Sequence, residues 1–488
     1  MAADLKQKTI SGLFWSFINN VALQGIAFVV GILLARLLTP REFGLMGMVL
    51  VFIVISGTFV DSGFKSALIR KKHCTQADYS TVFYYNLLMG LIFYLILFFT
   101  AGAISRFFDE PELKWIVRVI GLQLIIRSLT IIQGTIVTKR VDFKLFAKIG
   151  IISSVFSGAI AIVMAYNGFG VWSLVIRDII GVFLGSALIW YWNPWMPSLI
   201  FSIQSFKELF GFGSKLLTSA LLDSAFQNIY ILVIGKYFSA QQLGFYTRAE
   251  MFKNLPSQQI TGIMSAVTYP VLAQMQDDKT MLKNGYKKMI KSTMFLSFIL
   301  LAGMAAIADS MVLTLIGEQW RQSIVYLQLL CFPGALYPLQ ETNLNMLKVQ
   351  GRSDLVLKLE IIKKLLAIPT IIIGIIWGIK VMILGMWVNS LIAYYLNSYY
   401  SGRHINYPMR EQVADILPSL LLALFMGAMV FMAGWLMTFD NLPKLILQIF
   451  IGGIISIGLS ELLKLEAYLY IKQIVLEKLT SVYHARRK

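Results

Sequence analysis

Long apolar segments follow one another along almost the whole of this 488-residue chain. A helix that crosses a bilayer needs about 20 predominantly apolar residues, and about fourteen segments approach that length. Only 14% of the residues are charged, against about 25% in a typical soluble domain. The sequence therefore predicts an all-α membrane protein with about fourteen transmembrane helices. The predicted spans are residues 13–35, 43–64, 82–104, 115–138, 148–166, 171–192, 214–235, 252–272, 292–313, 323–346, 365–379, 381–400, 417–437 and 445–463.

Basic residues are distributed unevenly between the loops that join these segments. With the N-terminus inside, about 30 Lys and Arg residues fall on the cytoplasmic side and about 11 on the opposite side, which is the bias that sets membrane orientation. The pattern predicts a multi-pass protein with both termini in the cytoplasm. It also accounts for most of the net charge of +18, because the anionic inner leaflet attracts basic loops. We therefore expect no nucleic-acid partner.

A short pattern occurs twice, in Leu34–Leu45 and in Ile234–Phe245, 200 residues apart and without a gap. A basic residue, a hydroxyl residue and a glycine recur in register. Each copy joins a span that leaves the cytosol to one that returns, so each forms an outward hairpin whose glycine permits a tight turn or close packing. The repeat predicts two parallel six-helix lobes, related by a pseudo-twofold axis along the membrane normal, around a central site. The predicted regions are an N-terminal lobe (1–192), a cytoplasmic linker (193–213), a C-terminal lobe (214–400), and two extra transmembrane helices with a basic cytoplasmic tail (401–488).

Four motifs, in order along the chain, resemble those of bacterial polysaccharide flippases. Leu34–Leu45 is similar to their L-A-R-x-L-x-P-x-x-F-G-L hairpin, and Asp61–Arg70 to a D-x-G-x-x-x-A-L-I-basic end of the second helix. Tyr269–Asp278 resembles a P-x-x-A-x-x-Q-D-D segment, and Gly317–Leu330 resembles a G-E-x-W…L-Q-L-L entry to the tenth helix. The chain thus resembles the polysaccharide transporter branch of the MOP exporter superfamily, which includes Wzx-type flippases and the colanic acid exporter.

The resemblance implies a two-lobed, MOP/MATE-like fold. It also implies movement of an undecaprenyl-diphosphate-linked oligosaccharide, as used for polysaccharides such as lipopolysaccharide O-antigen, from the inner to the outer leaflet of the bacterial cytoplasmic (inner) membrane. A multidrug or small-molecule exporter and a lipid II exporter on the same fold stay open as alternatives. A membrane enzyme fits less well because the outer loops are short. We expect a monomer whose partners are the lipid-linked oligosaccharide and membrane lipid, with polysaccharide polymerase machinery as a further candidate.

Signals for cofactors and catalysis are missing from the sequence. The two cysteines, Cys74 and Cys331, are far apart and offer neither a disulfide framework nor a metal-ligand spacing. There is no G-x-x-x-x-G-K-[ST] segment, the phosphate-binding signature of many ATPases. We therefore expect no catalytic residue, no cofactor and no metal site, and a proton or a sodium ion stays open as the coupling ion.

Arginines within the predicted spans are the leading candidates for substrate binding. Ionisable residues inside a membrane are costly and are functional candidates by default. Arg127 lies in the middle of the fourth span and Arg177 lies inside the sixth. A guanidinium keeps its charge and can bind phosphate oxygens in a bidentate manner, so both could attract a diphosphate in a central cavity. The alternative is a structural ion pair, for example between Arg127 and Asp178 or Asp61.

The remaining charged candidates are assigned to gating or ion coupling. Asp223 and Glu341 lie within spans and could carry a coupling proton. Arg36 and Lys236 occupy equivalent positions near the two outer hairpins, where they either snorkel to the interface or act in gating. The full set is Asp61, Asp178, Asp223, Glu341, Arg36 and Lys236.

Overall fold

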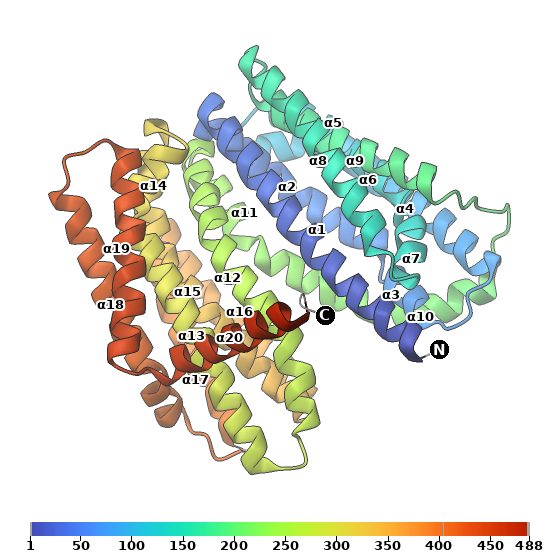
Figure 1. Cartoon of the computed structure of the whole chain (residues 1–488). Coiled ribbons are helices and arrows are strands. Elements are labelled where there is room, and N and C mark those ends of the chain that lie inside the picture. Colours follow the sequence, from blue (N-terminus) through green and yellow to red (C-terminus); the bar gives the residue numbers. More distant parts are fainter. Residues whose placement is uncertain (1, 404, 486–488) are drawn as a thin grey trace. The chain divides into compact units, whose positions relative to one another are not determined.

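The computed structural model describes residues 2–403 and 405–485, so the end of the predicted basic tail, residues 486–488, lies outside the described residues. Within those ranges the regular structure is entirely helical, and Figure 1 labels the helices along the chain. Contacts divide the chain into two compact units, Met1–Gly244 and Phe245–Lys488. The boundary falls inside one long helix, α12 (Ala240–Gln274). The predicted boundaries of the lobes and linker stay predictions.

The first unit contains eleven helices and the first residues of α12 within the described part of the chain. Its helices are α1 (Ala2–Leu37), α2 (Pro40–Asp61), α3 (Phe64–Arg70), α4 (Gln76–Phe108), α5 (Leu113–Ile120), α6 (Leu122–Ser128), α7 (Ile131–Lys139), α8 (Phe143–Tyr166), α9 (Val171–Trp192), α10 (Ile203–Gln227) and α11 (Ile229–Tyr237).

The second unit contains the rest of α12 and the helices that follow it. These are α13 (Lys279–Ala306), α14 (Ala308–Leu315), a 3-10 turn at Glu318–Trp320, α15 (Arg321–Val349), α16 (Ser353–Trp377), α17 (Ile379–Arg403), α18 (Met409–Leu436), α19 (Asn441–Leu462) and α20 (Glu466–Ala485). A chain of ion pairs joins three of them. Lys287 on α13 binds Glu411 and Asp415 of α18, and Lys291 binds Asp415 and Glu466, the first residue of α20.

Nine of the described helices are long and apolar enough to cross a membrane, and the number rises to eleven if each of two bent helix pairs is one span. The bent pairs are Leu113–Ser128 with Ile131–Lys139, at 43°, and Ile203–Gln227 with Ile229–Tyr237, at 41°. The protein is therefore a multi-pass membrane protein. The predicted number of fourteen is not confirmed. The helices α12, α15 and α16 are long enough to span a membrane, but they are not among the helices that are also apolar enough.

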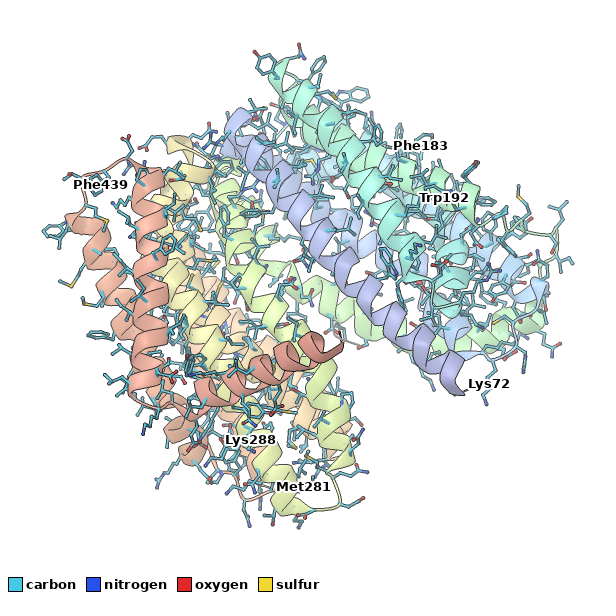
Figure 2. The ribbon with its side chains drawn as sticks, viewed as in Figure 1. Lys72, Phe183, Trp192, Met281, Lys288 and Phe439 are labelled. Atoms are coloured by element: carbon cyan, nitrogen blue, oxygen red, sulfur yellow. The ribbon has the colours of Figure 1, made fainter. Side chains whose placement is uncertain are left out.

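Large apolar side chains cover much of the outside of the molecule. Phe183 of α9 is 57% exposed, and Phe439, between α18 and α19, is 61% exposed; both point outward in Figure 2. Contiguous exposed apolar surface of this extent is rare on a soluble protein. It is the surface that a helix needs where lipid replaces water as the solvent.

A break at Ser62 and Gly63 separates α2 from α3, at the end of the predicted span 43–64. Ser62 and Gly63 both adopt left-handed backbone conformations, with φ of 48° and 71°. The break coincides with a close approach to α10, since a Cβ atom on Gly63 would lie 2.5 Å from the carbonyl oxygen of Gly213. Glycine is the residue that tolerates both a positive φ and a neighbouring main chain at this distance. The helix resumes at Phe64 as the short helix α3.

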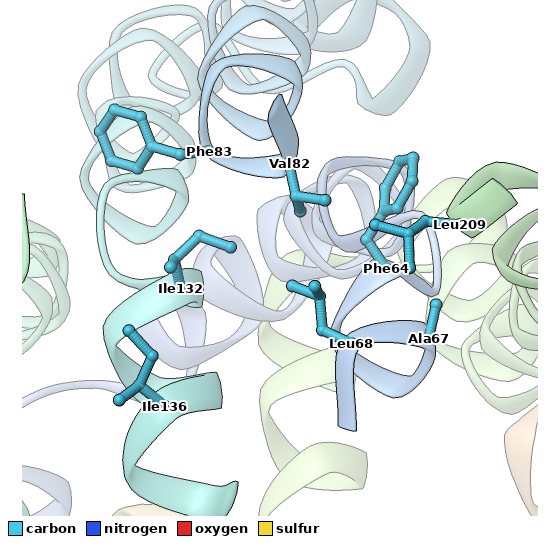
Figure 3. Close-up of a cluster of buried hydrophobic side chains, with 8 residues drawn as sticks. All are labelled: Phe64, Ala67, Leu68, Val82, Phe83, Ile132, Ile136 and Leu209. Carbon is cyan, nitrogen blue, oxygen red and sulfur yellow. The ribbon is translucent and has the colours of Figure 1, made fainter. Parts of the chain in front are cut away.

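A cluster of buried apolar side chains fixes α3 against its neighbours. Figure 3 shows it, and its members come from α3, α4, α7 and α10. They are Phe64, Ala67, Leu68, Val82, Phe83, Ile132, Ile136 and Leu209. Phe64 is fully buried and packs edge-on against Tyr85, with ring centroids 4.8 Å apart. The cluster determines which way the remaining side chains of α3 point.

Replacing Phe64 by alanine should therefore loosen this end of the first unit. A Phe→Ala change at a fully buried site typically lowers the free energy of unfolding by about 3 kcal/mol or more. Thermal unfolding of the purified protein in detergent would measure the loss. Phe99→Ala is the matched control, because Phe99 is 76% exposed and should leave the melting temperature unchanged. Equal melting temperatures for the two variants would contradict the prediction.

Candidate functional site

A cavity of about 900 Å³ lies within the first unit. This is at the upper end of the range for small-molecule sites, about 300–1,000 Å³. Residues of α1, α2, α3, α6, α7, α8, α9 and α10 line it. Three cations and two carboxylates are among them, and the charged lining residues are Asp61, Lys65, Arg127, Arg177 and Asp178. Neutral hydrogen-bonding groups complete the polar part of the wall: Thr58, Ser66, Gln123, Thr130, Ser154 and Ser157.

The face of α6 explains why Arg127 points to the cavity. Gln123 and Arg127 are four residues apart, so they lie on the same side of the helix, and both line the cavity. The helix ends one residue after Arg127, and the chain bends before α7. The hydroxyl of Thr130 donates a hydrogen bond to the carbonyl oxygen of Arg127, at 2.9 Å. A broken helix is tolerated at membrane depth where it lines a cavity or is buried in protein.

Arg177 and Asp178 of α9 line the same cavity. Asp178 is close enough to both Arg127 and Arg177 for an electrostatic interaction with each. In the described part of the chain, however, neither guanidinium lies within 4.0 Å of a carboxylate oxygen. Asp178 therefore interacts with Arg127 from beyond 4.0 Å, and the alternative of a structural pair between Arg127 and Asp178 or Asp61 stays a prediction as well. The two arginines are placed where they could accept an anionic ligand, and their role stays a prediction.

Asp61 and Lys65 lie at the end of the cavity where α2 gives way to α3. Asp61 is the last residue of α2, and its carboxylate accepts a weak hydrogen bond from the backbone N–H of Lys65, at 3.4 Å. Lys65 and Ser66 occupy the side of α3 that faces the cavity, while Phe64, Ala67 and Leu68 belong to the apolar cluster. The division of α3 into two faces thus positions a cation at this end.

Lys71 fixes the C-terminal end of α3 by a bridge to two other helices. Its ammonium group lies 3.1 Å from Asp78 of α4 and 2.9 Å from Glu208 of α10. Burial lowers the pKa of Lys71, but the hydrogen bonds to Glu208 and Asp78 outweigh it, so its pKa is raised above the ordinary value. Lys71 therefore stays charged at any physiological pH, and the bridge holds α3, α4 and α10 together beside the cavity.

The other predicted gating or coupling residues lie elsewhere in the described structure. Asp223 is on α10, one turn beyond the lining residue Ala220, but is not itself among the residues that line the cavity, and Glu341 is on α15 of the second unit. Arg36 is in the last turn of α1. Lys236, in the last turn of α11, lies 3.4 Å from the carboxylate of Asp109 and over the ring of Phe107. Their proposed roles stay predictions.

Two charged residues were missed by the reasoning from sequence. Glu250 and Lys253 lie one turn apart in α12, and both are only partly exposed. The predicted span began at residue 252, so Glu250 fell in the preceding loop and Lys253 at the edge of the span. In the structure the helix begins at Ala240. The side chain of Lys253 packs against Gly334 of α15, where a Cβ atom on the glycine would lie 2.6 Å from it. The repeat could have revealed this, because Pro40 and Ala240 are equivalent positions and Pro is favoured at the start of a helix.

Among the described residues, no group of three or more His, Cys, Asp or Glu side chains is placed so that it could hold a metal ion. Both cysteines are free thiols. The polar chemistry available in the cavity is therefore that of guanidinium, ammonium, carboxylate, amide and hydroxyl groups.

Solved structures with the same fold are transporters and flippases. The lipid II flippase MurJ in an inward closed conformation superposes with a TM-score of 0.76, covering 95% of this chain and all of that one at 15% identity. An inward-facing multidrug resistance MATE family transporter of the MOP superfamily gives a TM-score of 0.61 over 78% of this chain and 94% of the other, at 16% identity. These likenesses show that the helical fold of this chain is the one that MurJ and the MATE family transporter share.

Sequence comparison assigns the chain to a family. Residues 33–325 match the model of a family described as polysaccharide biosynthesis protein, and the chain belongs to this family, the polysaccharide transporter branch of the MOP superfamily. Among its relatives, the teichuronic acid biosynthesis protein TuaB of Bacillus subtilis is 26% identical over 72% of this chain and 73% of its own length. The lipopolysaccharide biosynthesis protein WzxC of Escherichia coli is 27% identical over 76% of both chains. The resemblance predicted from four motifs is thus confirmed.

Proposed function

We propose that this protein is a flippase that moves an undecaprenyl-diphosphate-linked oligosaccharide from the inner to the outer leaflet of the bacterial cytoplasmic membrane by alternating access. The observation that carries the proposal is the cavity in which Arg127 and Arg177 stand without a carboxylate within 4.0 Å among the described residues. Asp178 is one carboxylate near two guanidinium groups, and a diphosphate would supply further negative charge with bidentate hydrogen bonds. Hydroxyl and amide groups on the same wall suit a sugar.

The names of the relatives support this class of substrate. Besides TuaB and WzxC, the succinoglycan biosynthesis transport protein ExoT of Rhizobium meliloti is 25% identical over 72% of both chains. All three take part in making a polysaccharide, and ExoT is described as a transport protein. The proposal makes this chain a transporter rather than an enzyme, with the lipid-linked oligosaccharide and membrane lipid as partners. A polymerase is a further candidate partner, and the protein is proposed to act as a monomer.

The proposed topology has fourteen spans in two parallel six-helix lobes followed by two extra helices. In this arrangement α12, α15 and α16, which have 35, 29 and 25 residues, span the membrane as well. Their polar residues suit helices that line a passage rather than face lipid. The distribution of Lys and Arg supports cytoplasmic N- and C-termini.

The membrane potential supports transport in the outward direction. A diphosphate carries about two negative charges, and each charge that moves outward across an inside-negative membrane gains about 2.3 kcal/mol per 100 mV. Outward movement of the anionic head group therefore needs no ATP. A coupled proton or sodium ion is compatible with this energetics.

Transport by purified protein in lipid vesicles would test the proposal. The vesicles carry a fluorescent undecaprenyl-diphosphate-linked oligosaccharide, and a membrane-impermeant glycosidase reports how much of it has reached the outer surface. We expect faster exposure than in protein-free vesicles, and a further increase when the lumen is made negative. The same rate with and without protein would overturn the proposal. Transport of lipid II alone, or of a cationic drug alone, would assign the protein to one of the two alternative exporter classes.

A further inference from the structure

The two copies of the repeated hairpin cross each other at their glycines. A Cβ atom on Gly44 of α2 would lie 1.7 Å from the carbonyl oxygen of Ala240, and one on Gly244 of α12 would lie 1.8 Å from the carbonyl oxygen of Pro40. Pro40 and Ala240 are equivalent in the repeat, as are Gly44 and Gly244. The contact is therefore reciprocal, and all four residues belong to the first unit. Only glycine fits where a main chain approaches so closely.

An acidic turn lies beside this crossing and binds both hairpins. The turn joins α4 to α5 at residues 109–112. Arg41, next to Pro40, pairs with Glu110 at 2.5 Å and with Glu112 at 2.9 Å. Lys236, within the second hairpin segment, pairs with Asp109 at 3.4 Å. The partners of the first two ion pairs both belong to the predicted N-terminal lobe (1–192). The Lys236–Asp109 pair joins that lobe to the start of the predicted C-terminal lobe (214–400).

The crossing and the cavity lie at opposite ends of α2. The helix has 22 residues, which at 1.5 Å per residue gives about 33 Å, close to the thickness of a hydrocarbon core. Pro40 and Gly44 are in its first turns, and the cavity is lined by residues from Leu50 to its last residue, Asp61. The basic loops place the end at Asp61 toward the cytoplasm. The crossing is therefore at the outer side, beyond the end of the cavity.

We propose that this crossing is the outer gate of the transporter, an inference that rests on the proposed function. The contacts between the copies, namely Gly44 with Ala240, Gly244 with Pro40, and Lys236 with Asp109, hold the outer side closed while the head group enters from inside. They separate when the head group leaves outward. The ion pairs of Arg41 with Glu110 and Glu112 stay formed, because all three residues belong to the predicted N-terminal lobe.

The composition of the gate suits repeated opening. Asp109 is 81% exposed, and an exposed ion pair contributes only about 0–1 kcal/mol. The glycine contacts are close but bring few side-chain atoms together, so little apolar surface is lost when they part. The gate closes tightly because the two main chains fit, and it opens without breaking a buried charge pair.

Paired cysteines would test this inference in a protein whose Cys74 and Cys331 are replaced by alanine. The gate pair is Lys236→Cys with Asp109→Cys, and the control pair is Arg41→Cys with Glu110→Cys; both are joined by a bifunctional thiol reagent that a reductant cleaves. Each variant is compared with itself before cross-linking. Cross-linking the gate pair should slow flipping in vesicles about tenfold or more, because outer opening is then prevented, and the reductant should restore it. The control pair should flip equally well before and after cross-linking.

Two results would overturn the gate, and neither is a failure of the proposed function. Undiminished flipping by the cross-linked gate pair is the first, since it shows transport with the crossing held shut.

The second uses Ala240→Cys, at a position that is 2% exposed, and a membrane-impermeant thiol reagent on the outer side. Labelling should accelerate when the lipid-linked oligosaccharide is being flipped, while Trp115→Cys, at a position that is 57% exposed, should label at a constant rate. An unchanged rate at position 240 during flipping would exclude opening there. If the variants do not flip before any cross-linking, the proposed function itself has failed.

Discussion

Replacing Arg127 by alanine should reduce flipping of the lipid-linked oligosaccharide about 10- to 100-fold at limiting substrate. A hydrogen bond to a charged group contributes about 1.5–3 kcal/mol, and each 1.4 kcal/mol is a factor of about ten in affinity. Arg127→Lys keeps the charge but loses the planar fork that binds two phosphate oxygens, so it should lie between the wild type and Arg127→Ala. The vesicle assay with a titration of substrate measures the effect.

The control for this prediction is Arg118→Ala. Arg118 is on α5 of the same unit, is not among the residues that line the cavity, and lies over the ring of Phe98 at 4.4 Å. Its replacement removes an equal charge without touching the candidate site, so flipping should be unaffected. Wild-type flipping by both Arg127→Ala and Arg127→Lys would remove Arg127 from the mechanism. An equal loss in Arg118→Ala would point to a general effect of charge instead of a binding site.

The second large effect is expected at the glycine crossing. A Cβ on Gly44 would stand 1.7 Å from a main-chain oxygen, so Gly44→Ala forces α2 and α12 apart. Overpacking of a well-packed contact typically costs about 1–3 kcal/mol. We expect a lower melting temperature, faster outer labelling at Ala240→Cys in the same chain, and slower flipping, since a gate that cannot close exposes the cavity to both sides. Gly244→Ala should behave in the same way.

Gly102→Ala provides the comparison for both glycine variants. Gly102 is in α4 of the same unit, and a Cβ there would meet nothing within 4 Å. Alanine is a better helix former than glycine by about 1 kcal/mol, so this change should leave the melting temperature unchanged or raise it. If Gly44→Ala melted, labelled and flipped as Gly102→Ala does, the close contact between the two hairpins would have no part in closure.

Several features of the fold could be predicted because they depend on long, averaged signals. The helical class and the family followed from hydropathy and from four motifs. The predicted span at residues 171–192 coincides with α9, and the glycines of the repeat were expected at a turn or a close contact; they lie at a close contact. Arg127 and Arg177 were singled out because a charge in an apolar segment is conspicuous, and they do line one cavity.

Other features depend on tertiary contacts that no single segment records. A window of about 20 residues averages over a short break, so the bend between α6 and α7 was invisible in the sequence. The polar residues of α12 lowered its hydropathy and moved its predicted start from Ala240 to residue 252, which left Glu250 in the preceding loop and Lys253 at the edge of the span. The partners of Arg41 and Lys236 are 69 and 127 residues away along the chain, and only folding identifies them.

The reciprocal glycine contact has a consequence for how the gene can change. What each glycine faces is a peptide oxygen, which every amino acid carries, so no replacement at Pro40 or Ala240 can make room for a side chain at Gly44 or Gly244. Damage at one glycine therefore has no suppressor on the opposite helix, and recovery requires a return to glycine. The two repeated segments differ at most of their positions, but at this point each of them is tied to the other's backbone.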